Sequence, residues 1–123
     1  MKVTRAHGTG GRSSQEIIDT IFLPQLKNEF LALTDGVKLP FDSSELIVTT
    51  DAHVVEPIFF PGGDIGKLAV TGVINDLLTC GGRPRYLSAT FILEEGFEIA
   101  ELRRTVSGIA GEHGLAPIAA GTC

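Results

Sequence analysis

Hydrophobic residues change their spacing several times along the chain, which indicates alternating helices and strands. Residues 13–16 have the form of a capping box, in which a serine and a glutamate three residues later satisfy free backbone donors. We therefore expect a helix to begin there and Pro24 to close or kink it. A second short helical stretch is expected over residues 26–33. The predicted apolar face of the first helix consists of Ile17, Ile18, Ile21 and Phe22.

Two longer helices are expected further along the chain. Asp64 is a suitable N-cap for a helix that runs to about Thr79 and ends at two glycines, residues 81–82. Gly66 and Gly72 would let this helix pack closely against a neighbour. Its predicted inward face consists of Ile65, Leu68, Ala69, Val73 and Leu77 or Leu78. Residues 98–113 carry apolar side chains at helical spacing, namely Ile99, Leu102, Val106, Ile109 and Ala110.

Four segments have the composition of strands. Residues 45–51 and 54–60 are rich in β-branched side chains. Residues 85–93 alternate, which places Leu87, Ala89, Phe91 and Leu93 on one face of a half-buried strand. Residues 115–120 are apolar and bounded by glycines, which predicts a last strand.

This order of elements predicts one α+β domain over residues 1–123, with a mixed sheet and flanking helices. No repeat or linker divides the chain. Nothing in the sequence covers the edge of the final strand, so we expect the domain to depend on a partner chain or on further residues.

Composition and charge narrow the function. The chain has 43% hydrophobic residues and a formal charge of −5, and its basic residues form no stripe, so we expect no binding to nucleic acid. Uncharged stretches reach only about ten residues, half of what a membrane helix needs, and no apolar signal segment opens the chain. We therefore expect a cytoplasmic protein without a membrane segment. Cys80 and Cys123 lie far apart, which indicates neither a zinc site nor a disulfide scaffold.

A glycine-rich loop is the first candidate for chemistry. Gly8, Thr9, Gly10 and Gly11 precede the first helix, where backbone N–H groups can approach a phosphate. The spacing matches neither of the common nucleotide-binding patterns, so a plain N-terminal turn is an open alternative.

Three aspartates are candidate metal ligands. Asp35, Asp51 and Asp76 come from separate elements, and Mg²⁺ that is shared with nucleotide phosphates takes carboxylate oxygens and keeps several waters. Each aspartate alone also fits an ordinary role, as a turn residue, a strand end or an exposed helix residue. Asn75 is either a phosphate-side donor or a helix residue without a special role.

Several strings occur together in one order, and they closely resemble the N-terminal domain of the HypE family of hydrogenase maturation proteins. They are HGTGG (residues 7–11), TTD (49–51), FFPGGDIGKLA (59–69), NDL (75–77) and FILEEG (91–96). The third and fifth strings distinguish HypE from its wider superfamily of aminoimidazole ribonucleotide synthetase, thiamine-monophosphate kinase and selenophosphate synthetase. The resemblance covers nearly the whole chain.

The resemblance implies a fold, a reaction and partners. In this family the N-terminal domain pairs with its twin into a β-barrel homodimer, and ATP with Mg²⁺ lies between the glycine-rich loop and the aspartates. On that basis Gly8 to Gly11 match the loop over the nucleotide, and Asp35, Asp51 and Asp76 match the metal and phosphate positions. The family uses ATP to dehydrate a carbamoyl group on its own C-terminal cysteine to a thiocyanate, whose cyanide goes to the iron of [NiFe] hydrogenase, with HypF, HypC and HypD as partners.

The chain also departs from the family pattern. We expect the family's second domain and its C-terminal acceptor cysteine to be absent, and we assign no carbamoyl-bearing role to Cys123. At residues 121–123 an acidic metal ligand that the family pattern implies is missing. Residues 34–37 also differ from the family pattern, which weakens the assignment of Asp35 more than that of Asp51 or Asp76. Two alternatives therefore stay open: a non-catalytic module for dimerisation or partner binding, and a different ATP-using enzyme of the superfamily, against which the HypE strings argue.

Overall fold

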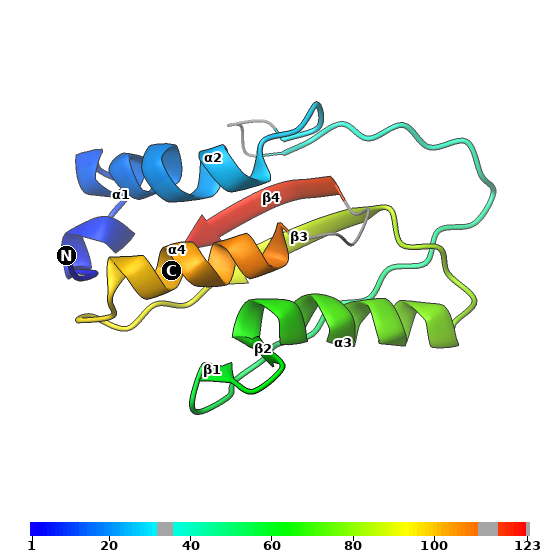
Figure 1. The fold of residues 1–123 in the computed structure, drawn as a ribbon. Coiled ribbons are helices and arrows are strands. Elements are labelled where there is room, and N and C mark those ends of the chain that lie inside the picture. Colours follow the sequence, from blue (N-terminus) through cyan, green and yellow to red (C-terminus); the bar gives the residue numbers. More distant parts are fainter. Residues whose placement is uncertain (32–35, 111–115, 123) are drawn as a thin grey trace.

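The computed structural model describes residues 1–31 and 36–110, and the backbone of residues 116–122. The helices lie side by side next to the parallel strands β3 and β4, with α4 between the α1–α2 arm and α3 (Figure 1). In chain order the elements are η1 (Arg5–Gly8), α1 (Arg12–Ile17), η2 (Ile18–Phe22), α2 (Leu23–Leu26), β1 (Phe59–Phe60), β2 (Gly63–Asp64), α3 (Ile65–Thr79), β3 (Tyr86–Phe91), α4 (Ile99–Ile109) and β4 (Ala116–Thr122). The expected α+β class is confirmed, but in place of one mixed sheet the described residues form two separate two-stranded sheets, antiparallel β1–β2 and parallel β3–β4.

The first helical arm starts and ends differently from the prediction. Helix α1 begins at Arg12 with Gly11 as its N-cap and with no side-chain cap, so the capping box over residues 13–16 is wrong. Pro24 does not close the helix, because the helical turns run on from α1 through η2 into α2. The carbonyl of Thr20, four residues before Pro24, accepts a hydrogen bond from the Arg103 guanidinium at 2.7 Å. A π-helical turn, η2, joins α1 to α2.

No helix follows α2 in the described part of residues 26–33, so that prediction is wrong as far as the structure describes it. The side-chain oxygen of Asn28 accepts a hydrogen bond from Phe30 N at 2.8 Å. This local bond favours a turn over a continued helix. The predicted apolar face of the first helix is confirmed, since Ile17, Ile21 and Phe22 are buried and Ile18 packs against them.

Helix α3 begins and ends as the sequence predicts. The Asp64 carboxylate accepts a hydrogen bond from Lys67 N at 3.0 Å, which is the expected N-cap. At the other end Gly81 has a φ of 76°, and its N–H donates to the carbonyl of Leu78 at 3.0 Å.

The buried face of α3 differs from the predicted one. Gly66 and Val70 are buried and Ile74 packs on the core, whereas Leu68 and Leu78 are exposed. The helix is apolar on most sides, so hydrophobic spacing alone cannot select a face. The crossing with α4 selects it instead.

That crossing confirms the close packing expected at Gly66. A Cβ atom added there would collide with the backbone oxygen of Thr105 and would lie 3.2 Å from the Ile109 side chain. On the α4 side, a Cβ atom added to Gly108 would lie 2.8 Å from the Asp64 carboxylate. Two glycines therefore let the start of α3 approach α4 until backbone and side-chain atoms are in contact.

The core lies where α4, the α1–α2 arm, α3 and β3 meet. Leu102 and Val106 of α4 are almost fully buried, and the Phe22 ring lies 5.0 Å from the Phe91 ring of β3. The other buried hydrophobic residues are Val3, Ile17, Ile21, Leu26, Val70, Ile99 and Ile109.

Strand β3 pairs in parallel with β4, from Tyr86 beside Ala116 to Phe91 beside Thr122, with a register shift between Leu87 and Ser88. The expected strands over residues 85–93 and 115–120 are thus confirmed in essence. The predicted inner face of β3 is confirmed too, because the side chains of Leu87, Ala89, Phe91 and Leu93 pack against the core.

The two strands predicted over residues 45–60 are mostly wrong for the single chain. Only β1 forms, as a short antiparallel hairpin with β2. Residues 36–58 run as an extended segment that first arcs away from the helices and then returns along α3 to β1 (Figure 1). Leu46, Val48 and Val54 are 70%, 77% and 97% exposed. A strand needs a neighbour for its backbone hydrogen bonds, and the described residues of this chain provide none here.

Candidate functional site

The glycine-rich loop between η1 and α1 is fixed by a small network of hydrogen bonds. The Thr9 hydroxyl donates to the carbonyl of Ala6 at 3.0 Å. The Ser14 hydroxyl donates to the carbonyl of His7 at 2.7 Å and accepts from Gly10 N at 3.0 Å. Gly10 has a φ of 76°, which favours glycine. Hydrogen bonds within the chain therefore fix the shape of the loop.

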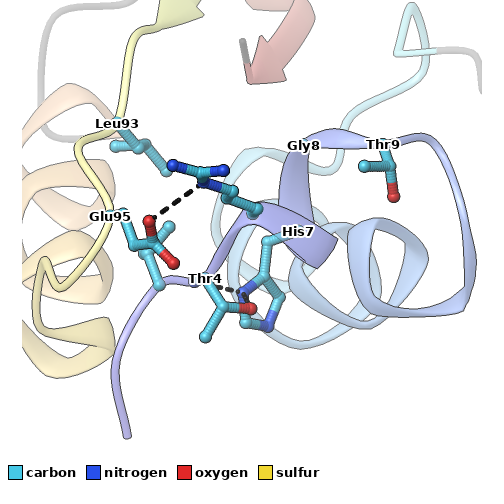
Figure 2. A pocket seen from close by; sticks show the side chains of 8 residues that line it. Thr4, His7, Gly8, Thr9, Leu93 and Glu95 are labelled. Atoms are coloured by element: carbon cyan, nitrogen blue, oxygen red, sulfur yellow. Dashed lines mark hydrogen bonds and ion pairs between the residues drawn. The ribbon is translucent and has the colours of Figure 1, made fainter.

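Space is open next to this loop. A Cβ atom added to Gly8 or Gly10 would meet no heavy atom within 4 Å. A cavity of about 240 Å³ adjoins the loop, and Figure 2 shows it lying between η1 and the segment after β3. Its lining residues are Val3, Thr4, Arg5, His7, Gly8, Thr9, Leu93 and Glu95. A bulky polar group can thus reach the backbone of the loop.

The segment after β3 holds the first residues of the chain, which lead into η1, in place. The N–H of Val3 donates to the carbonyl of Phe97 at 2.7 Å, and the N–H of Gly96 donates to the carbonyl of Val3 at 2.8 Å. The Arg5 side chain reaches across the cavity to Glu95, with an N–O distance of 3.2 Å (Figure 2). The HGTGG and FILEEG strings, far apart in the sequence, therefore form one site.

The candidate metal ligands lie in another region. Asp51 is in the extended segment, where its carboxylate accepts from Ala52 N at 2.8 Å and lies 3.8 Å from Nε2 of His53. The His53 ring packs against Gly72 of α3, one helical turn before Asp76. Asp51 thus lies along the same helix that carries Asn75 and Asp76, both of which are exposed.

The predicted site residues form two groups in one chain. The loop of Gly8, Thr9, Gly10 and Gly11 precedes α1, whereas Asp76 lies in the last turn of α3, beyond α4 (Figure 1). Asp35 lies outside the described residues. Among residues 1–31 and 36–110, no group of three histidine, cysteine or acidic side chains could hold a metal ion. The aspartates have the right chemistry for Mg²⁺, as hard oxygen ligands, but the described residues supply only two of the three predicted ones.

Sequence reasoning missed several residues that shape the site. Ser14 lies within the predicted capping box, yet its hydroxyl connects the glycine-rich loop to His7. Arg5, Glu95 and His53 carried no distinctive signal, because a lone charged or imidazole side chain is common on any surface. The position of Glu95 in the FILEEG string was the one available indication.

Comparison with known proteins defines the class. The N-terminal domain of AIR synthase related proteins matches residues 34–119, so the chain belongs to this family. Within the family its similar relatives are HypE proteins. It is 47% identical over 109 residues to the carbamoyl dehydratase HypE of Azotobacter vinelandii, covering 88% of this chain and 32% of that protein. It is 42% identical over 123 residues to the HypE of Rhizobium leguminosarum bv. viciae, covering 98% of this chain and 35% of that protein. The resemblance inferred from the sequence is confirmed.

Solved structures of HypE proteins also have the fold of this chain. A crystal structure of the hydrogenase maturation protein HypE in complex with ATP has a TM-score of 0.92 and 42% identity, covering 97% of this chain and 36% of that chain. Escherichia coli HypE has a TM-score of 0.82 and 38% identity, covering 90% of this chain and 38% of that chain. The chain spans about a third of the length of the curated relatives it matches.

Among the described residues, no helix has the length and apolar composition needed to cross a membrane.

Proposed function

We propose that residues 1–123 form an N-terminal, ATP-binding domain that acts in the cytoplasm in the maturation of [NiFe] hydrogenase. The observation that carries this proposal is the TM-score of 0.92, at 42% identity over 97% of the chain, with a HypE that was solved with ATP. The glycine-rich loop and its adjoining cavity agree with it, because there is open space beside Gly8 and Gly10 and the cavity is lined by Gly8 and Thr9 just before helix α1.

The proposed reaction is that of a carbamoyl dehydratase, in which ATP drives the dehydration of a cysteine-bound carbamoyl group to a thiocyanate. Phosphorylation of the carbamoyl oxygen makes that oxygen a leaving group. In this scheme the loop of Gly8 to Gly11 would bind phosphate, Asn75 would donate to it, and Asp35, Asp51 and Asp76 would hold Mg²⁺. The loop and Asp76 lie apart in one chain, so a single site of this kind requires a second chain of the proposed dimer to bring the two groups together. The chain covers a third of its relatives, so the complete reaction would need the remainder of such a protein, with HypF, HypC and HypD as proposed partners.

Calorimetric titration of the 123-residue chain with Mg·ATP tests the proposal. Saturable binding is expected for the wild-type chain. Asp76→Asn should weaken binding about tenfold or more, because a neutral amide is a poorer ligand for Mg²⁺ than a carboxylate. Asp19→Asn is the matched control, since Asp19 is an exposed helix residue whose side chain accepts from Gln15 at 2.9 Å. Equal binding by the wild-type and Asp76→Asn chains would refute the assignment of Asp76.

A second candidate function is dimerisation or partner binding without catalysis. The exposed apolar side chains of Leu46, Val48 and Val54 favour it, because unpaired extended backbone with apolar side chains can add to another sheet. We propose that two chains pair through this segment into a β-barrel. Analytical ultracentrifugation should then find a dimer that Val48→Asp shifts toward monomer. A wild-type chain that stays monomeric at high concentration would exclude the barrel.

A further inference from the structure

We propose that His7 is a positioning residue, which holds the glycine-rich loop in its nucleotide-ready shape through the neutral imidazole tautomer that carries its proton on Nε2. The nucleotide part of this inference rests on the proposed function. The part that concerns the shape of the loop depends only on the geometry of η1.

The His7 ring closes the turn that leads into the loop. Its Nδ1 atom accepts a hydrogen bond from Thr4 N at 2.8 Å and lies 3.1 Å from the Thr4 hydroxyl oxygen. The backbone N–H of His7 donates to the carbonyl of Thr4 at 3.0 Å. Because Nδ1 accepts from an N–H group, it carries no proton, and the proton of the neutral ring is on Nε2. Figure 2 shows the ring folded back beside Thr4.

The backbone of the same residue holds the loop itself. The carbonyl of His7 accepts from the Ser14 hydroxyl at 2.7 Å, and that hydroxyl oxygen accepts from Gly10 N at 3.0 Å. The ring of His7 therefore fixes the start of the turn, and its carbonyl fixes the far side of the loop. If the ring loses its bond to Thr4, only the backbone bond from His7 N to Thr4 still holds the turn. The His7 carbonyl is then less restrained, and so is the Ser14 hydroxyl that it orients toward Gly10 N.

Such a restraint matters because glycine has the largest backbone entropy of any residue. If the loop of Gly8 to Gly11 became ordered only on binding, the conformational entropy lost in ordering it would weaken the affinity for nucleotide. A loop already held by Ser14 and His7 has met that cost during folding. We therefore expect His7 to change the affinity for nucleotide without contacting it.

Two variants of His7 test whether the hydrogen-bond acceptor must lie at the place of Nδ1, because they differ in the position of the acceptor but little in side-chain size. In His7→Asn the side-chain oxygen is attached to Cγ, as Nδ1 is in histidine, so it can accept from Thr4 N. In His7→Gln the oxygen is one bond further out, nearer the place of Nε2. Neither side chain is an imidazole, and the two differ by one methylene, so they form a matched pair.

The experiment combines nuclear magnetic resonance with calorimetry on the full chain. For the wild type, imidazole ¹⁵N shifts should show an unprotonated Nδ1 and a protonated Nε2. Amide exchange of Thr4 and Gly10 should be slow in the wild type and in His7→Asn and about fivefold to tenfold faster in His7→Gln, as expected for the loss of one hydrogen bond. Binding of Mg·ATP should weaken by a similar factor in His7→Gln and recover in His7→Asn.

The outcomes distinguish this inference from the proposed function. A proton on Nδ1 in the wild type, or equal amide exchange in the two variants, would overturn the role of His7 whatever the nucleotide result. A wild-type chain that does not bind Mg·ATP would refute the proposed function, while the amide exchange would still decide whether His7 shapes the loop. Equal nucleotide binding by both variants, with unequal exchange, would overturn its effect on affinity.

Discussion

The glycine crossing between α3 and α4 gives a quantitative prediction about stability. Replacing glycine by alanine inside a helix normally stabilises a protein by up to about 1 kcal/mol. At Gly66 the added Cβ atom would collide with the Thr105 backbone oxygen, and overpacking of this kind costs about 1–3 kcal/mol. A backbone oxygen cannot rotate away, so we take a cost near the upper value. The expected net effect of Gly66→Ala is a loss of about 2 kcal/mol in the free energy of unfolding.

Gly72→Ala is the matched control in the same helix. There the Cβ atom would lie 2.6 Å from Nε2 of His53, whose side chain is 16% exposed and can move aside. Gly72→Ala should therefore leave the stability unchanged or raise it by up to about 1 kcal/mol. Urea denaturation followed by circular dichroism measures both, and Gly66→Ala should also lower the melting temperature by roughly 8 °C. The reasoning fails if Gly66→Ala is as stable as the wild type, or if both variants lose the same stability.

Two further predictions use the same denaturation assay. Leu102→Ala should lower the free energy of unfolding by about 3 kcal/mol, because Leu102 is 1% exposed at the centre of the core and its removal leaves a cavity; a loss below about 1 kcal/mol would place it outside the core. Asp64→Ala should cost about 1 kcal/mol, because Lys67 N loses its side-chain acceptor, and Asp64→Asn, which keeps an acceptor oxygen, should recover most of that loss.

The sequence predicts helices best where one polar residue or a clear periodicity determines them. Asp64 marks the start of α3 because an N-cap acts within one turn. The apolar stripe of α4 predicts its buried face because the rest of that helix is polar. The face of α3 could not be predicted in the same way, since its orientation depends on contact between Gly66 and the backbone of another helix.

Strand prediction has a different limit. The β-branched composition of residues 45–58 describes a preference for extended backbone, and the structure shows extended backbone there. Composition does not say which strand will accept the hydrogen bonds, and within the described part of the chain only β1 finds a partner in β2. The sequence thus predicted the conformation of this segment but not its pairing.

The sequence predicted which motifs belong to the candidate site but not which of them are in contact. The order of HGTGG, TTD, NDL and FILEEG led to the family, which the comparisons confirm. That the first and last of these strings adjoin each other follows from backbone bonds between Val3 and residues 96–97, which no local pattern reveals. The sequence-based metal site of Asp35, Asp51 and Asp76 stays a prediction, with Asp35 outside the described residues.

The extended segment of residues 36–58 separates two stretches of the chain, and each stretch contributes part of the hydrophobic core. One stretch contributes Ile17, Ile21 and Phe22, and the other contributes Val70 and, from α4, its buried apolar face. A protease that cuts at residues 41–48, all of which are exposed, would meet little packed structure, yet the two products would still share one hydrophobic interior. We therefore expect the nicked chain to remain a single particle, and two separately expressed halves to reassemble into the domain.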